Sequence, residues 1–245
     1  MICKNCQNEF EGNFCNHCGQ KASVRRLDLK YLVQDVPNSV FQLNRGFFFT
    51  VKEILTKPGH AIRNFIEGKR QAYYKPIAFL IVVSTIYILI NYFMGVNSLV
   101  EDVLTGIEIG ARAEEDESNL FFTKWLPKYQ IYVPFFVLPL FSIASYLAFR
   151  KSDYNYVEHF VLNVYITAQQ FIIYSAFAFV ISDDGPLVLL QFIIGIGFVF
   201  WTYIQFFSNK KLSRKVGLVV LTYMFFILFS IVLIFLVGLV YRVLQ

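Results

Sequence analysis

The sequence predicts an all-α integral membrane protein with about five transmembrane helices, preceded by a small cytosolic zinc ribbon and amphipathic interfacial helices. Three observations lead to this fold class. Hydrophobic residues make up 56% of the 245 positions, and 28 of them are phenylalanine. Five apolar stretches have roughly the 20 residues that a helix needs to cross a bilayer. All four cysteines lie near the N-terminus in the pattern CxxC-x8-CxxC.

The N-terminal segment 1–22 is predicted to be a zinc-binding module. Two thiolates three positions apart can bind one ion, and two such pairs complete the tetrahedron that Zn²⁺ prefers in structural sites. The predicted ligands are Cys3, Cys6, Cys15 and Cys18. A segment this short has little hydrophobic core, so we expect the metal to supply most of its folding energy. A closed four-thiolate site leaves no position for a substrate, which favours a structural Zn²⁺ over a catalytic one.

Other interpretations of these cysteines stay open at the level of sequence. Two disulfides would need an oxidising compartment, which the topology below argues against. His17 could replace one cysteine as a ligand, although it lies inside a CxxC pair and is expected to face water. The pattern also does not distinguish zinc from iron, although zinc is the more common ion in such structural sites.

The membrane domain is predicted to comprise residues 76–245. Its spans are expected at 76–96, 131–149, 157–182, 187–207 and 216–241. Of the 22 lysines and arginines, eighteen lie in residues 1–75 and in the connections after the second and fourth spans. Lysine and arginine accumulate on the cytoplasmic side of membrane proteins. We therefore expect a cytosolic N-terminus and an outside C-terminus.

Residues 23–75 are predicted to form basic amphipathic helices between the zinc module and the first span. Apolar residues recur there at helical spacing, and the stretch from residue 45 onward carries seven cations: Arg45, Lys52, Lys57, Arg63, Lys69, Arg70 and Lys75. Such a stretch beside a span is typical of an interfacial helix on anionic lipid headgroups. A cytosolic helical lobe packed on the membrane domain is an equally good interpretation. Nucleic-acid binding is a weaker one, because aromatic residues do not alternate with arginines here.

Polar residues inside the predicted spans are candidates for a binding or transport site. The third span carries His159, Asn163, Thr167 and Gln170 on one side, and the fourth carries Gln191 and Gln205. The alternative is that amides and hydroxyls pair across helices and stabilise their packing. An acidic run in the connection 97–130 could bind a hard cation, but its spacing does not match a calcium loop. Motifs of nucleophilic, metallohydrolase or nucleotide-dependent enzymes are missing, so we do not expect an enzyme.

Two blocks of the sequence resemble a bacterial family of integral membrane proteins that is known only as a domain of unknown function. The first is Phe10–Gln20, which ends in the motif CNHCGQ. The second consists of residues 43–55, the triplet Lys57-Pro58-Gly59, residues 67–70 and the pair Lys75-Pro76. The resemblance implies four cysteine zinc ligands and a location in the bacterial inner membrane, and it brings no activity with it.

Two functions are consistent with this sequence. The first is a membrane-anchored adaptor or scaffold, whose zinc ribbon docks a cytosolic or membrane protein partner. The second is the binding or transport of a small molecule or lipid at a polar site on the third and fourth spans.

Overall fold

The computed structural model describes the chain except for residues 30–31, 33–44, 97–132, 181–185 and 245. The described part is all-helical apart from an N-terminal segment with two isolated β-bridges. The helices are α3 (Arg45–Thr56), α4 (Pro58–Glu67), α5 (Pro76–Met94), α8 (Val133–Ala148), α9 (Tyr156–Phe177), α10 (Pro186–Phe206) and α11 (Leu212–Leu244).

Local sequence signals explain where several helices begin and end. Pro58 and Pro76 occupy the first turns of α4 and α5, where the missing N–H has no partner to lose. α9 begins with a capping box, in which the Asn155 side chain accepts from the amide of Glu158 and the Glu158 carboxylate accepts from the amide of Asn155. α5 ends at Gly95, whose φ of 66° is in the left-handed region that glycine tolerates.

Four helices of the described part are long and apolar enough to cross a membrane: α5, α9, α10 and α11. The predicted span 131–149 corresponds to α8, an apolar helix of only 16 residues. A helix of that length is shorter than the roughly 20 residues that a full crossing requires. The described structure thus supports four of the five predicted spans by length, and α8 is a shorter apolar helix beside them.

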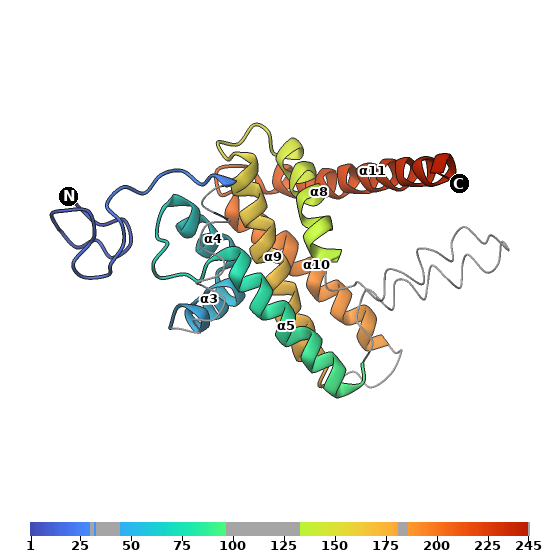
Figure 1. Cartoon of the computed structure of the whole chain (residues 1–245), viewed down its shortest axis with the longest axis horizontal. Coiled ribbons are helices and arrows are strands. Elements are labelled where there is room, and N and C mark those ends of the chain that lie inside the picture. Colours follow the sequence, from blue (N-terminus) through green and yellow to red (C-terminus); the bar gives the residue numbers. More distant parts are fainter. Residues whose placement is uncertain (30–31, 33–44, 97–132, 181–185, 245) are drawn as a thin grey trace.

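The helices α5, α9 and α10 lie side by side, and the C-terminal part of α11 extends away from the others (Figure 1). α5 and α9 run in the same direction, because Tyr74 lies beside Tyr165 at one end and Tyr87 stacks on Phe171 further along. The Tyr165 hydroxyl donates to the carbonyl of Tyr74, only two residues before α5 begins. The first turns of α9 therefore precede the start of α5 and pack against other elements.

Those elements include α3 and α4, which form a lobe against the same end of the bundle. The Gln169 side chain of α9 donates to the carbonyl of Ile54 near the end of α3, with a donor–acceptor distance of 2.6 Å. α4 buries Ala61, Ile62, Phe65 and Ile66 against its neighbours. α3 and α4 thus pack on the bundle as a helical lobe, and the cytosolic location of this lobe stays a prediction. Its contact with lipid headgroups stays a prediction.

α4 and α10 approach closely at Gly59. A Cβ atom added to Gly59 would lie well inside contact distance of the Phe206 amide nitrogen and of the Gln205 side chain. The Gly59 amide donates to the Gln205 side chain at 3.2 Å. Glycine is therefore needed at this position by close packing, without a positive φ.

We expect Gly59→Ala to destabilise the protein by about 1–3 kcal/mol, the usual range for overpacking a well-packed contact. The measurement is thermal or denaturant unfolding of the detergent-solubilised chain. Gly197→Ala is the matched control, since a Cβ at Gly197 of α10 meets nothing within 4 Å. Equal stability of the two variants would contradict the close approach of α4 and α10.

Candidate metal centre and buried polar groups

The two CxxC segments fold into the same tight turn. In the first, the Gln7 amide donates to the Cys3 carbonyl at 2.9 Å; in the second, the Gly19 amide donates to the Cys15 carbonyl at 2.8 Å. Gln7 and Gly19 have φ values of 60° and 74°. A left-handed conformation suits glycine, whereas at Gln7 it costs roughly 1–2 kcal/mol. The first turn therefore needs an additional source of stability, which a metal ion would provide.

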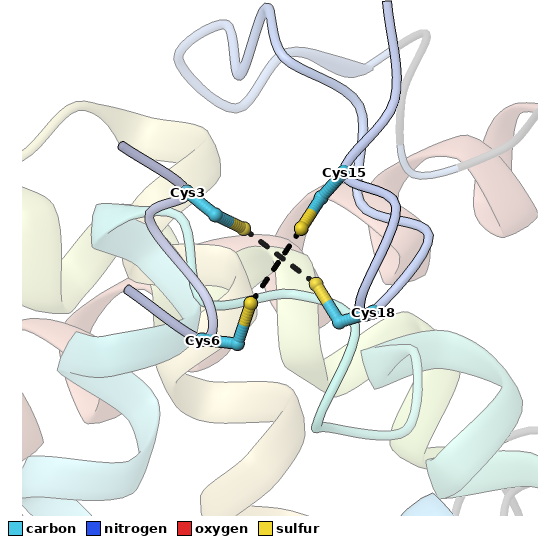
Figure 2. A group of neighbouring side chains, drawn as sticks. All are labelled: Cys3, Cys6, Cys15 and Cys18. Carbon is cyan, nitrogen blue, oxygen red and sulfur yellow. Dashed lines mark hydrogen bonds between the residues drawn. The ribbon is translucent and has the colours of Figure 1, made fainter. Parts of the chain in front are cut away.

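The four cysteine sulfurs converge on one point (Figure 2). The Sγ atoms of Cys3 and Cys18 are 3.5 Å apart, and those of Cys6 and Cys15 are 3.6 Å apart. All four sulfurs lie within 4.8 Å of one another. A tetrahedral ion with Zn–S bonds of ~2.3 Å would place its sulfurs about 3.8 Å apart, whereas a disulfide requires ~2.05 Å. The four thiols are free in this structure, and their spacing fits a metal ion.

Backbone amides around the sulfurs favour the thiolate form at part of the site. Burial opposes ionisation of Cys15, but hydrogen bonds from the amides of Cys18 and His17 outweigh it and lower its pKa to about 6. In contrast, the pKa of Cys6 is raised to about 12, because burial and the neighbouring thiols outweigh the hydrogen bond from the Asn8 amide. Several thiolates repel one another in this small volume, so a bound cation is required to hold all four deprotonated.

His17 has an exposed side chain and does not belong to the group of converging metal-ligating atoms. The metal-ligating group found among the described residues consists of the four cysteines alone. This arrangement agrees with the prediction that His17 faces water.

The cysteine ribbon docks onto the loop between α4 and α5. Three consecutive amides of this loop have side-chain acceptors from the ribbon: Gln20 Oε1 accepts from Arg70 at 3.1 Å and from Gln71 at 3.3 Å, and Asn5 Oδ1 accepts from Ala72 at 3.2 Å. Asn5 lies inside the first CxxC and Gln20 follows the second by two positions. Both turns of the metal site therefore hold the loop that leads into the first span.

A second attachment joins the segment after the ribbon to the start of α9. The Arg26 guanidinium forms two hydrogen bonds with the Glu158 carboxylate, at 2.8 and 2.7 Å. The hydrogen bond to Glu158 raises the pKa of Arg26 despite some desolvation. Glu158 also completes the capping box of α9, so one buried carboxylate connects the N-terminal segment to the bundle.

Two cations satisfy the carbonyls at the end of α10. Arg63 donates to the carbonyls of Gln205 and Phe206, and Lys215 donates to that of Ile204 at 2.9 Å. Cations at a helix C-terminus are favoured by the helix dipole. Arg63, which was predicted to face headgroups, is thus engaged within the protein.

The other predicted basic residues fall into three groups. Lys52 and Lys57 are exposed, and Lys69, Arg70 and Lys75 are half-buried. The Arg70 side chain donates to the carbonyl of Arg25 at 2.7 Å. Nothing is described for the side chain of Arg45.

The predicted intramembrane polar site is divided by the structure. Asn163 donates to the hydroxyls of Ser142 and Ser145 and accepts from Tyr203 at 2.6 Å. Ser145 also contacts Nδ1 of the fully buried His159 at 3.0 Å. These bonds join α8, α9 and α10, which is the pairing across helices that was the alternative to a binding site.

Thr167 and Gln170 lie one and two turns further along α9 and line a cavity of about 270 Å³ between α8, α9, α10 and α11. Asn163 also lines it. Gln205 lies elsewhere, against Gly59, and Gln191 is half-buried on α10 outside the cavity lining.

Several residues that hold these sites together were not predicted. The capping box was visible as Asn155 and Glu158 at the start of a predicted span, a recognised signal of a helix start. The partners of Asn163 on α8 and α10, and the acceptors Asn5 and Gln20, had no local signal. Their partners are distant in the sequence, so only the packed structure identifies them.

The fold and the site together define a class: a multi-pass helical membrane protein with an N-terminal four-cysteine cluster that can hold a metal ion. Comparison with protein families adds one finding. Residues 44–88 are similar to a family described as protein of unknown function DUF3667. The match covers less than a fifth of the chain, from α3 into α5, and includes the loop on which the ribbon docks. Curated proteins and solved structures gave no match.

We predict that the purified chain binds one Zn²⁺ ion and that the Cys15→Ser/Cys18→Ser double variant does not retain it. Elemental analysis measures the metal content. Removal of the ion should unfold the ribbon locally, which hydrogen exchange of residues 1–22 would detect as lost protection. His17→Ala should keep its zinc. Unchanged zinc content in the double variant would contradict the assignment.

We also predict that Asn5→Leu/Gln20→Leu releases the ribbon from the loop before α5 while zinc remains bound. The amides of Arg70, Gln71 and Ala72 would lose their acceptors, at a cost of about 1 kcal/mol each. Hydrogen exchange at these three positions should accelerate. Asn13→Ala is the control, since it alters an exposed amide of the same ribbon. Unchanged exchange in the double variant would show that the docking bonds do not hold the loop.

Proposed function

We propose that this protein is a membrane-anchored adaptor, in which a zinc-loaded N-terminal ribbon docks a protein partner at the cytoplasmic face of a bacterial inner membrane. The observation that carries the proposal is the way the ribbon is mounted. Asn5 and Gln20 fix it to the loop before α5, and its metal site is closed by four cysteines. A closed structural ion supports a binding surface rather than a reaction centre.

The ribbon offers apolar side chains for such a partner. Ile2 and Phe14 each directly precede the first cysteine of a CxxC pair, and they are 62% and 55% exposed. They occupy equivalent places in the two turns, each in an isolated β-bridge. Exposed aromatic and aliphatic residues on a rigid support are the usual anchors of a protein interface.

The membrane domain in this proposal holds the ribbon at the bilayer. The basic connections after α8 and α10, with Arg150, Lys151, Lys210 and Lys211, support a cytosolic ribbon. The proposed outside C-terminus also requires that the shorter helix α8 completes a fifth crossing. The exposed Lys52 and Lys57 of the α3–α4 lobe are available for anionic headgroups.

The test is a quantitative pull-down from native membranes with the intact chain and with Ile2→Ser/Phe14→Ser. We expect a specific partner to be depleted at least about tenfold by this double variant, because interface anchors typically contribute about 2 kcal/mol. Zinc content should stay unchanged. Cys15→Ser/Cys18→Ser should deplete the same partner.

Phe48→Ser is the matched control, because Phe48 is an exposed aromatic residue of α3 and not part of the ribbon. A partner that is retained by both double variants would refute the adaptor function. A partner that is lost equally with Phe48→Ser would show that general hydrophobic adhesion explains its capture.

A further inference from the structure

The cavity between α8, α9, α10 and α11 is lined by polar groups that lack partners. Thr167 and Gln170 of α9 and Tyr223 of α11 all line it. Within the described part of the chain, no hydrogen bond reaches the side chain of any of the three. All three side chains are half-buried, and polar groups that face a hollow in an apolar bundle are costly unless something within it bonds to them.

Asn163 forms a fixed part of the same wall. Its amide nitrogen donates to two serines and its oxygen accepts from Tyr203, so its orientation is set from outside the cavity. It is followed on the helix by Thr167 and Gln170 at intervals of four and three residues, which places all three on one face of α9. The remaining lining is apolar and comes from all four helices: Val137, Leu138, Phe141, Ile166, Val199 and Phe226.

The composition of the lining restricts the ligand. None of the lining residues carries a charge, so an ionised headgroup would lose its hydration without gaining a partner. One polar face opposite apolar walls matches a molecule with hydroxyl or carbonyl groups at one end and hydrocarbon at the other. A cavity of about 270 Å³ is close to the lower limit of small-molecule sites.

The position of the cavity indicates where such a molecule would come from. Val137 lines the cavity and is 38% exposed, so the cavity reaches the outer apolar surface of α8. On α11, Ile227 directly follows the lining residue Phe226 and is 56% exposed. The surrounding surface is thus hydrocarbon-seeking, which favours entry from the bilayer.

We propose that this cavity is a binding site for an uncharged acylglycerol. Its hydroxyl and ester groups bond to Thr167, Gln170 and Tyr223, and the beginning of its acyl chain packs against Phe141 and Phe226. The site is independent of the adaptor function, since it uses no residue of the ribbon or of the loop that the ribbon holds.

The experiment is photolabelling of the full-length, zinc-loaded protein in detergent with a monoacylglycerol that carries a diazirine in its acyl chain. Labelled peptides are identified by mass spectrometry. We expect label on α8 and α11 around Phe141 and Phe226. In Thr167→Val/Gln170→Leu, which removes two hydrogen bonds and keeps the side-chain shapes similar, labelling should fall about tenfold or more. Unlabelled monoacylglycerol should compete, and an anionic phosphatidic acid should compete at least tenfold less.

Gln191→Leu is the matched control, because Gln191 is a polar residue of α10 outside the cavity lining. It should label like the wild type. If the polar double variant does not fold, Val199→Phe fills the cavity from α10 without removing a polar group and should abolish labelling. Equal labelling of all variants, or label spread evenly over the exposed face of α11, would overturn the proposal in favour of ordinary lipid contact. Equal competition by phosphatidic acid would overturn the uncharged ligand class.

Discussion

The rest of this structure depends on one constraint: backbone polar groups at the breaks between apolar helices must find partners. The chain interrupts its helices twice between α3 and α5, beside an apolar bundle. The carbonyl of Ile54 is bonded by Gln169, and the amide of Tyr74 by Thr50. The carbonyl of Tyr74 is bonded by Tyr165. Each partner comes from another element, so satisfying the backbone also fixes how α3, α5 and α9 pack.

The same constraint connects the four-cysteine cluster to the helical bundle. The amides of the loop before α5 are bonded by Gln20 and Asn5, whose positions are set by the two cysteine turns. The final carbonyls of α10 are bonded by Arg63 and Lys215, which brings α4 and α11 to the same helix end. The ribbon and the α3–α4 lobe are therefore held to the bundle by hydrogen bonds at its open ends. The segment that resembles a known family, residues 44–88, is where most of these bonds converge.

The polar side chains of α9 take two different roles. Asn163 bonds to two serines and a tyrosine of neighbouring helices, Nδ1 of His159 contacts Ser145, and Gln169 bonds to α3 and α10. Thr167 and Gln170 face the cavity. The face of α9 separates the two roles, because one side of α9 contacts the lobe and the end of α10 and another side contacts the junction of α8 and α11: the neighbours Gln169 and Gln170 take different roles. Polar residues in a predicted span thus serve both packing and the proposed ligand site.

The sequence by itself determined the helical elements and the four cysteines of the cluster. The spacing of the cysteines, the length of an apolar run and a proline at a helix start are all local properties of the sequence. The four clustered cysteines and the helices were therefore predictable, although the predicted helix ends differ from the observed ends by a few residues. Tertiary structure alone decided which groups meet. Arg63 caps α10 instead of facing lipid headgroups, and Gln205 lies against Gly59 rather than beside Gln170. Such pairings join residues that are far apart in the chain. Hydrophobic periodicity shows on which face of a helix a residue lies, but it does not show which other element covers that face.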